Sequence, residues 1–242
     1  TYIDPRHTEI DKLIQHIRNP SLSRNEQRQQ LDLLQALNQR HLEKHQNEAE
    51  MESRIHSFEL AYNMQMQASD VFDVKREPKH IQEMYGEGSQ NRQLLMARRL
   101  VERGVRFVQL WHGKGQPWDS HNNIKSAHRS VANQCDQGLA ALITDLDQRG
   151  LLDETLVVCT SEHGRTPKIN TQKGGGRDHW SRVYTSLIAG AGVKRGHIVG
   201  ASDKHGSDVA DRPISPKDLL ATMYHLLGID PHLAIADRTG RP

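Results

Sequence analysis

Five residues between positions 119 and 179 could bind a metal ion, and they stand in three short polar stretches. They are Asp119, His121, Glu162, His163 and His179. A carboxylate supplies negative charge and a neutral imidazole supplies a directional lone pair, a combination that suits zinc and similar divalent ions. The sequence therefore predicts a divalent-metal site, with zinc as the first candidate and calcium or manganese as alternatives.

Two arginines and a glycine run accompany these residues. Arg165 follows His163 by two positions, and Arg177 stands between the glycines 174–176 and His179. A guanidinium group can hold a phosphate or sulfate through two parallel hydrogen bonds. Glycines let the backbone come close to an ion or an anionic group. Arg165 and Arg177 are therefore predicted as catalytic residues that steady an oxyanion beside the metal.

Each of these motifs also has an ordinary explanation. The chain has 15 histidines, and most of them cannot be ligands. Asp119 and His121 alone would also fit a turn capped by the aspartate. Arg165 could neutralise Glu162 without a metal, and the glycine run could be a linker. The joint occurrence of the motifs at the ends of successive predicted strands favours the metal site.

The elements that must position these residues begin at Val105. From there the sequence alternates strand, loop, helix and strand, which is typical of an α/β fold with a mostly parallel sheet flanked by helices. Strands are predicted at 105–111, 155–161 and 185–189, the second buried on both faces. Ligands collect at the carboxyl ends of such strands. Two of the polar stretches follow the first and second predicted strands, and the third, at 174–180, precedes the strand at 185–189.

Helices are predicted on both sides of this pattern. Apolar residues at helical spacing predict two helices within 24–68, meeting near 46–48, and another helix over 92–103 ending at Gly104. A helix is predicted over 127–149. The last one begins at Ser215 and Pro216, an N-cap and a first-turn proline, and ends at Gly228. Its predicted core face consists of Leu219, Leu220, Met223 and Leu227.

Composition excludes some classes of partner. The 32 basic and 30 acidic side chains nearly cancel, so the concentrated positive charge that nucleic-acid binding needs is missing. No apolar run approaches the roughly 18 residues of a membrane span. Cys135 and Cys159 are predicted to be packed thiols. Since the sequence begins without Met or a signal-peptide pattern, we expect a fragment of a longer protein.

Several stretches of the sequence resemble a known family. They are 72–78 (FDVKREP), 98–108 (RRLVERGVRFV), 118–121 (WDSH), 164–167 (GRTP), 175–180 (GGRDHW) and 211–213 (DRP). In these motifs the chain resembles the sulfatase-like family known as domain of unknown function 1501, of the alkaline phosphatase superfamily.

The resemblance implies an alkaline-phosphatase-like fold, with a helical cap or insertion at 1–90 and the C-terminal part of the α/β domain at 91–242. It implies that Asp119, His121 and His179 bind one metal while Glu162 and His163 serve a second. The superfamily usually has Asp where Glu162 stands. It also implies that the nucleophile precedes this chain, and that the protein is exported or belongs to the cell envelope.

Two functions follow as hypotheses. The first is a metal-dependent hydrolase of phosphate or sulfate esters, acting on a small anionic ester, in which this chain supplies metal ligands but not the nucleophile. The alternative is a non-catalytic sulfatase-like module that binds an anionic ligand such as a sulfated glycan. A third hypothesis, a helical interaction protein, fits only residues 1–100.

Overall fold

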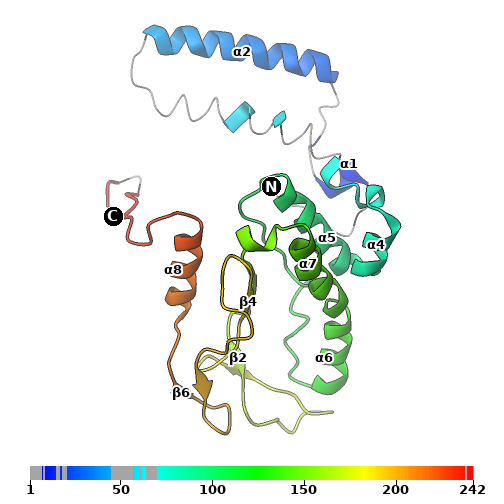
Figure 1. The fold of residues 1–242 in the computed structure, drawn as a ribbon, viewed down its shortest axis with the longest axis vertical. Coiled ribbons are helices and arrows are strands. Elements are labelled where there is room, and N and C mark those ends of the chain that lie inside the picture. The colour runs from blue at the N-terminus through cyan, green and yellow to red at the C-terminus, as the bar shows by residue number, and fades with distance from the viewer. Residues whose placement is uncertain are drawn as a thin grey trace. The chain divides into compact units, whose positions relative to one another are not determined.

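The computed structural model describes residues 7, 9–14, 17, 21–44, 57–59, 62–63, 70–237 and 239–241 (Figure 1). Contacts divide the chain into two compact units, Thr1–Gln82 and Glu83–Pro242. The sequence placed a boundary at residue 90. That the first part acts as a cap stays a prediction.

The first unit is helical in its described part. It contains α1 (Ile10–Leu13), α2 (Arg24–Lys44) and the 3-10 turn η1 (Val74–Arg76). Ser23 and Glu26 exchange backbone-to-side-chain hydrogen bonds of 2.7 and 3.3 Å, the reciprocal pattern that starts a helix. The predicted helix is confirmed over α2, and the predicted junction near 46–48 lies outside the described residues. Helix α4 (Lys79–Tyr85) runs from this unit into the next.

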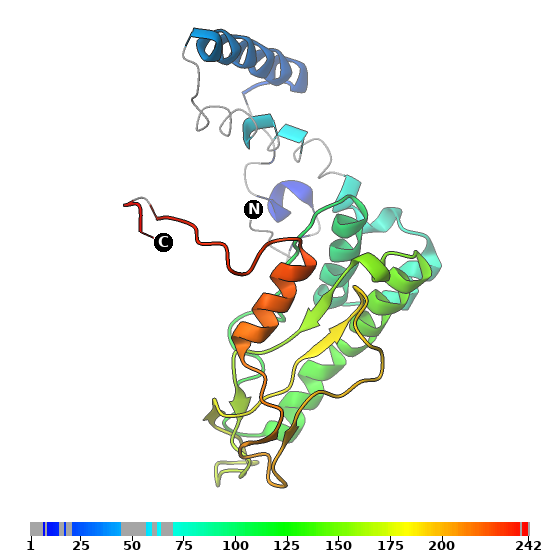
Figure 2. The ribbon, with the colours of Figure 1, turned by 60° about the vertical axis from the view of Figure 1, so that its left-hand side comes forward.

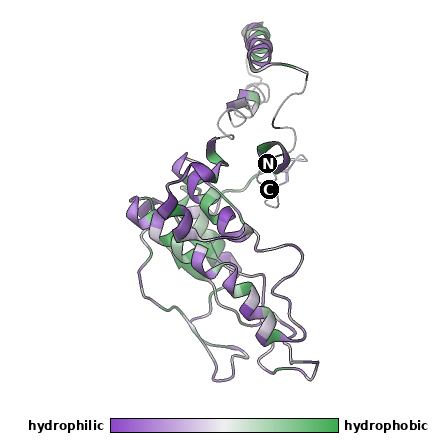
Figure 3. Cartoon of the chain, turned by 90° about the vertical axis from the view of Figure 1, so that its right-hand side faces the viewer, coloured by the Kyte–Doolittle hydropathy of each residue, from purple (hydrophilic) through white to green (hydrophobic). Residues whose placement is uncertain are grey.

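The second unit is built on a pair of packed helices, α5 (Ser89–Glu102) and α7 (Asp136–Gln148). Leu94, Leu95, Leu142 and Leu146 are buried at 1–7% exposure. In Figure 3 these helices carry both hydrophilic and hydrophobic residues, as helices with one buried face do.

Helix α6 (Ile124–Asn133) precedes α7, and the 3-10 turn η2 (Leu152–Glu154) follows it. The prediction of one helix over 127–149 is wrong, because the helix is interrupted at Gln134 and Cys135. The apolar spacing nevertheless placed Val131, Leu142 and Leu146 correctly on buried faces. The predicted helix end at Gly104 is confirmed: Gly104 has φ +81° and donates to the carbonyl of Val101 at 2.8 Å.

A buried polar network joins α5 to α7. The Nε of Arg98 lies 2.8 Å from Oδ2 of Asp145, and the two side chains are 1% and 2% exposed. Arg149 Nε donates to the same carboxylate at 2.7 Å, and the Tyr85 hydroxyl donates to it at 3.2 Å. Burial, followed by the charge of Asp145, raises the pKa of Tyr85.

The strands of the described residues form three antiparallel pairs. They are β1 (Val157–Cys159) with β4 (Leu187–Ala189), β2 (Gly164–Arg165) with β3 (His179–Trp180), and β5 (Ala201–Ser202) with β6 (Val209–Asp211). Figure 2 shows β1 and β4 lying side by side.

The predicted mostly parallel sheet, and with it the alkaline-phosphatase-like fold, is wrong for the described residues. The segment 105–111 has no strand, and the strand predicted at 155–161 is reduced to Val157–Cys159, half-buried to exposed. The strand predicted at 185–189 exists as β4, but it pairs antiparallel with β1. β-branched residues favour a pleated surface without specifying its neighbours, and an apolar run does not tell a central strand from a short exposed one.

Helix α8 (Pro216–Leu226) begins as predicted. Ser215 and Asp218 form a capping box, and Gly228 follows the helix. The prediction of a buried core face is wrong, because α8 has no buried residue and Leu220 is 47% exposed. Cys135 is half-buried, whereas Cys159 is exposed, so the packed-thiol prediction is wrong for Cys159. Within the described residues, every helix is too short or too polar to cross a membrane.

Candidate metal centre

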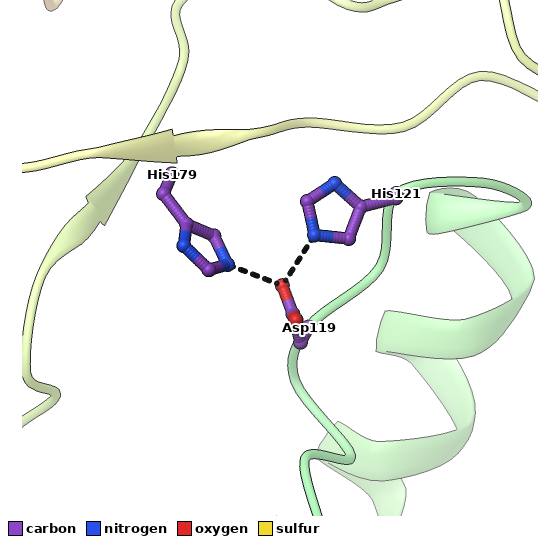
Figure 4. Close-up of side chains that lie close together, drawn as sticks. All are labelled: Asp119, His121 and His179. Atoms are coloured by element: carbon purple, nitrogen blue, oxygen red, sulfur yellow. Dashed lines mark hydrogen bonds and ion pairs between the residues drawn. The ribbon is translucent and has the colours of Figure 1, made fainter.

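Three of the five predicted ligands come together. The Nε2 atoms of His121 and His179 each lie 3.0 Å from the same oxygen of Asp119, Oδ1 (Figure 4). One candidate ligand atom from each residue lies within 4.8 Å of the other two. Residues separated by about sixty positions in the chain therefore offer a carboxylate and two imidazoles to one point.

The loop before α6 positions Asp119 and His121. Trp118 anchors this loop: its Nε1 donates to Nδ1 of His112 at 3.0 Å, and its carbonyl oxygen accepts from Nε2 of His128 at 3.1 Å. Both histidine rings meet the indole edge-on, at 5.5 Å between centroids. From the sequence, His128 would be assigned to a surface or loop role, and His112 to the same role as the likeliest exception. The contacts of both rings with Trp118, which precedes the ligand Asp119, were not predicted.

The short β2–β3 ladder positions His179. Its register sets His179 opposite Arg165, and the Arg165 guanidinium forms an ion pair with Oδ1 of Asp119. This hydrogen bond from Arg165, followed by one from His179, lowers the pKa of Asp119 although partial burial opposes the shift. Asp119 is therefore held in the ionised form that a metal ligand requires.

The glycine run 174–176 lies against the loop that carries Asp119 and His121. A Cβ added to Gly176 would lie 2.0 Å from the carbonyl carbon and oxygen of His121, so the two backbones touch. Backbone hydrogen bonds of 2.9 and 3.0 Å run from Asn123 and Ile124 to the carbonyls of Lys173 and Gly175. The glycines thus permit close approach to the backbone around His121. Their predicted approach to an ion or an anionic group stays a prediction.

Two residues that the sequence did not single out complete the surroundings of His121. Asp178 Oδ1 lies 2.7 Å from His121 Nδ1, and this hydrogen bond is the main reason that the pKa of Asp178 is lowered. Asn170 Nδ2 donates to the carbonyl of His121 at 3.1 Å and lies 3.4 Å from Asp178 Oδ1. The sequence feature that could have identified Asp178 is its place directly before the ligand His179 in the GGRDHW stretch.

The other predicted pair, Glu162 and His163, lies at the margin of the centre. The ring of His163 packs against that of His179 at 4.4 Å between centroids. Its Nδ1 donates to the Gly164 carbonyl at 2.9 Å, and its Nε2 lies 3.4 Å from Glu162 Oε1. Glu162 is 74% exposed, and its pKa is lowered mainly by a backbone hydrogen bond. A second metal at this pair stays a prediction.

The two arginines differ in their contacts. Arg165 contacts the centre directly through Asp119, whereas Arg177 Nη1 donates to the carbonyls of Thr166 and Pro167 at 2.5 and 2.9 Å. Arg177 therefore stabilises the loop that follows β2. Its predicted role in holding an anion stays a prediction.

Comparison with known proteins identifies a family for the chain but does not identify a function. No curated protein matches the chain, and no solved structure matches it. One family model, described as protein of unknown function (DUF1501), matches residues 4–242. This match covers nearly the whole chain, including every residue of the candidate centre. The chain therefore belongs to the DUF1501 family.

Proposed function

We propose that the chain supplies a divalent-metal site, with zinc as the first candidate, in a hydrolase of phosphate or sulfate esters. The observation that carries this proposal is the meeting of Asp119, His121 and His179 within 4.8 Å of one another. Catalytic zinc sites typically have three protein ligands of these types and an open fourth position.

The surroundings fit such a site. The side chains of His121 and His179 are 45% and 55% exposed, so a ligand can reach them from solvent. A bound divalent ion would polarise the ester oxygen and lower the pKa of an attacking group. Asp119, His121 and His179 would hold it, and Arg165 would neutralise charge on the anionic ester. In this proposal the nucleophile comes from outside residues 1–242.

One observation favours a second function. Glu162, His179 and His121 are all substantially exposed, whereas hydrolytic centres gain from excluding water. An open site of this kind also suits a non-catalytic module that binds a large anionic ligand such as a sulfated glycan. The two functions share the metal centre and differ in whether an ester bond is cleaved.

A hydrolysis assay separates them. The longest natural form of the protein is tested against aryl phosphate and aryl sulfate esters across zinc, manganese and calcium, alongside Asp119→Asn and Arg165→Gln. The control is Arg182→Gln, which removes a surface ion pair with Asp208. We expect metal-dependent cleavage that both site variants lose and the control keeps. Retention of a sulfated glycan without cleavage would support the binding module instead.

A further inference from the structure

We infer that Asp178 is a positioning residue that holds the imidazole of His121 so that its Nε2 atom faces the metal. The inference rests on the proposed metal site and names the side chain that orients one of its ligands. It assigns to Asp178 no contact with the metal or with the substrate.

The two nitrogens of His121 meet two different carboxylates. Nδ1 lies 2.7 Å from Oδ1 of Asp178, and Nε2 lies 3.0 Å from Oδ1 of Asp119. A carboxylate oxygen accepts in a hydrogen bond with a ring nitrogen, so the 2.7 Å contact has Nδ1 as the donor. Histidines that bind metal usually donate their second ring N–H to a carboxylate or carbonyl, which fixes the tautomer and the ring orientation.

Asp178 is itself held in place by its neighbours. Its backbone exchanges hydrogen bonds with Thr166: the Asp178 N–H donates to Thr166 Oγ1 at 3.0 Å, and the Thr166 N–H donates to the Asp178 carbonyl at 2.9 Å. The Asn170 amide bridges the Asp178 carboxylate and the His121 carbonyl. The bonds to Thr166 do not use the Asp178 carboxylate, so this pairing survives replacement of that side chain.

The simplest rival is an incidental surface pair. Asp178 is 54% exposed, and exposed ion pairs generally contribute little to stability. Its position argues against this reading, because Asp178 and His179 are adjacent in the chain. One contacts the Nδ1 side of His121, and the other meets Asp119 where His121 Nε2 points. A stretch of two residues thus supplies both a ligand and the partner of another ligand.

The first test is a double-mutant cycle on zinc affinity, measured by titration calorimetry with zinc alone. The cycle consists of wild type, Asp178→Ala, His121→Ala and the double variant. Asp178→Asn is added because its amide oxygen can still accept from Nδ1. The matched control is Asp147→Asn, which alters a surface ion pair with Arg195 at a similar exposure of 51%.

We expect Asp178→Ala to weaken zinc binding by ~10–100-fold, the usual consequence of losing a ligand's outer partner, with Asp178→Asn in between. In the His121→Ala background Asp178→Ala should have no further effect, because its role is exerted through that ring. Asp147→Asn should bind as wild type does. Unchanged affinity in Asp178→Ala, or an equal loss with and without His121, would overturn the inference.

The second test needs no metal. In the metal-free protein, the hydrogen-bonded Nδ1 proton of His121 should be detectable by ¹⁵N-resolved NMR in wild type and lost in Asp178→Ala. If wild type bound no zinc, the proposed function would fail. The role of Asp178 would then be decided by this proton alone: its presence in wild type and loss in the variant supports the positioning, and its absence from wild type overturns it.

Discussion

Two parts of the second unit are built in opposite ways. The α5–α7 helix pair buries its leucines and a three-partner network around Asp145, which is 2% exposed. The segment that holds the metal centre consists of loops and two-residue strands, and its two ligand histidines, His121 and His179, are about half exposed. The first part supplies apolar burial, whereas the second is organised by hydrogen bonds and ion pairs.

This difference indicates that the helix pair stabilises the fold and that the loop segment binds the proposed metal. Apolar burial is the main source of folding free energy, so substitutions in α5 and α7 should change stability first. Binding residues commonly lie on loops held by a rigid scaffold, so substitutions at the centre should change metal affinity while the protein stays folded.

The largest expected effect on stability is at Asp145. Asp145→Ala removes the buried carboxylate that faces Arg98 Nε, while Arg98 Nη1 keeps its 2.7 Å ion pair with Glu102. Breaking a buried ion pair costs about 3–5 kcal/mol of unfolding free energy. Asp147→Ala removes a surface pair of the same helix and should cost about 0.2–1 kcal/mol. Urea unfolding measures both, and equal losses would contradict the contrast between the two regions.

A substitution at Gly176 should lower both the stability of the protein and its affinity for zinc. Gly176→Ala places a methyl group against the His121 backbone, and overpacking costs about 1–3 kcal/mol. Because the displaced backbone carries a ligand, zinc affinity should also fall.

Gly115→Ala is the control for that substitution. Gly115 has φ +75° with nothing within 4 Å of an added Cβ, so alanine there is strained by about 1–2 kcal/mol without a clash. Its zinc affinity, measured by calorimetry, should equal that of wild type. A similar loss of affinity in both variants would mean that general destabilisation, not displacement of His121, is responsible.

The smallest effect is expected at Tyr85. Tyr85→Phe removes one hydrogen bond to Asp145, costing about 1 kcal/mol near pH 7. Since the folded state raises the pKa of Tyr85, the folded protein keeps a proton that the unfolded chain loses above about pH 10. The free energy of unfolding should therefore fall as pH rises past that value, and it should fall less steeply in Tyr85→Phe. Urea unfolding at pH 9–11.5 measures it in both proteins. Equal slopes of unfolding free energy against pH in wild type and Tyr85→Phe would contradict this.

Local signals predicted the helices well. Ser215 with Pro216 located the start of α8, and Gly104 located the end of α5, because caps depend on the residues beside them. The sheet could not be predicted in the same way. Strand pairing depends on segments far apart in the chain, and the apolar composition of 155–161 indicated a strand without indicating its partner or its burial.

The sequence predicted the metal-binding residues of the candidate site better than it predicted the residues around them. Asp119, His121 and His179 were chosen because carboxylate and imidazole suit divalent ions, and the structure brings these three together. Asp178 and Asn170 were missed, because an outer partner is recognised by the direction of a hydrogen bond. The hydrogen bond between Trp118 and His112 was missed for the same reason.

The most direct test of the metal centre is elemental mass spectrometry of the purified chain after zinc loading and dialysis. Asp119→Ala and His179→Ala are compared with wild type and with His225→Ala, a histidine of α8 outside the centre. We predict about one zinc per chain in wild type and in His225→Ala, and loss of zinc in the two site variants, all four being folded by circular dichroism. Zinc retained in Asp119→Ala and His179→Ala, or absent from folded wild type, would contradict the metal centre.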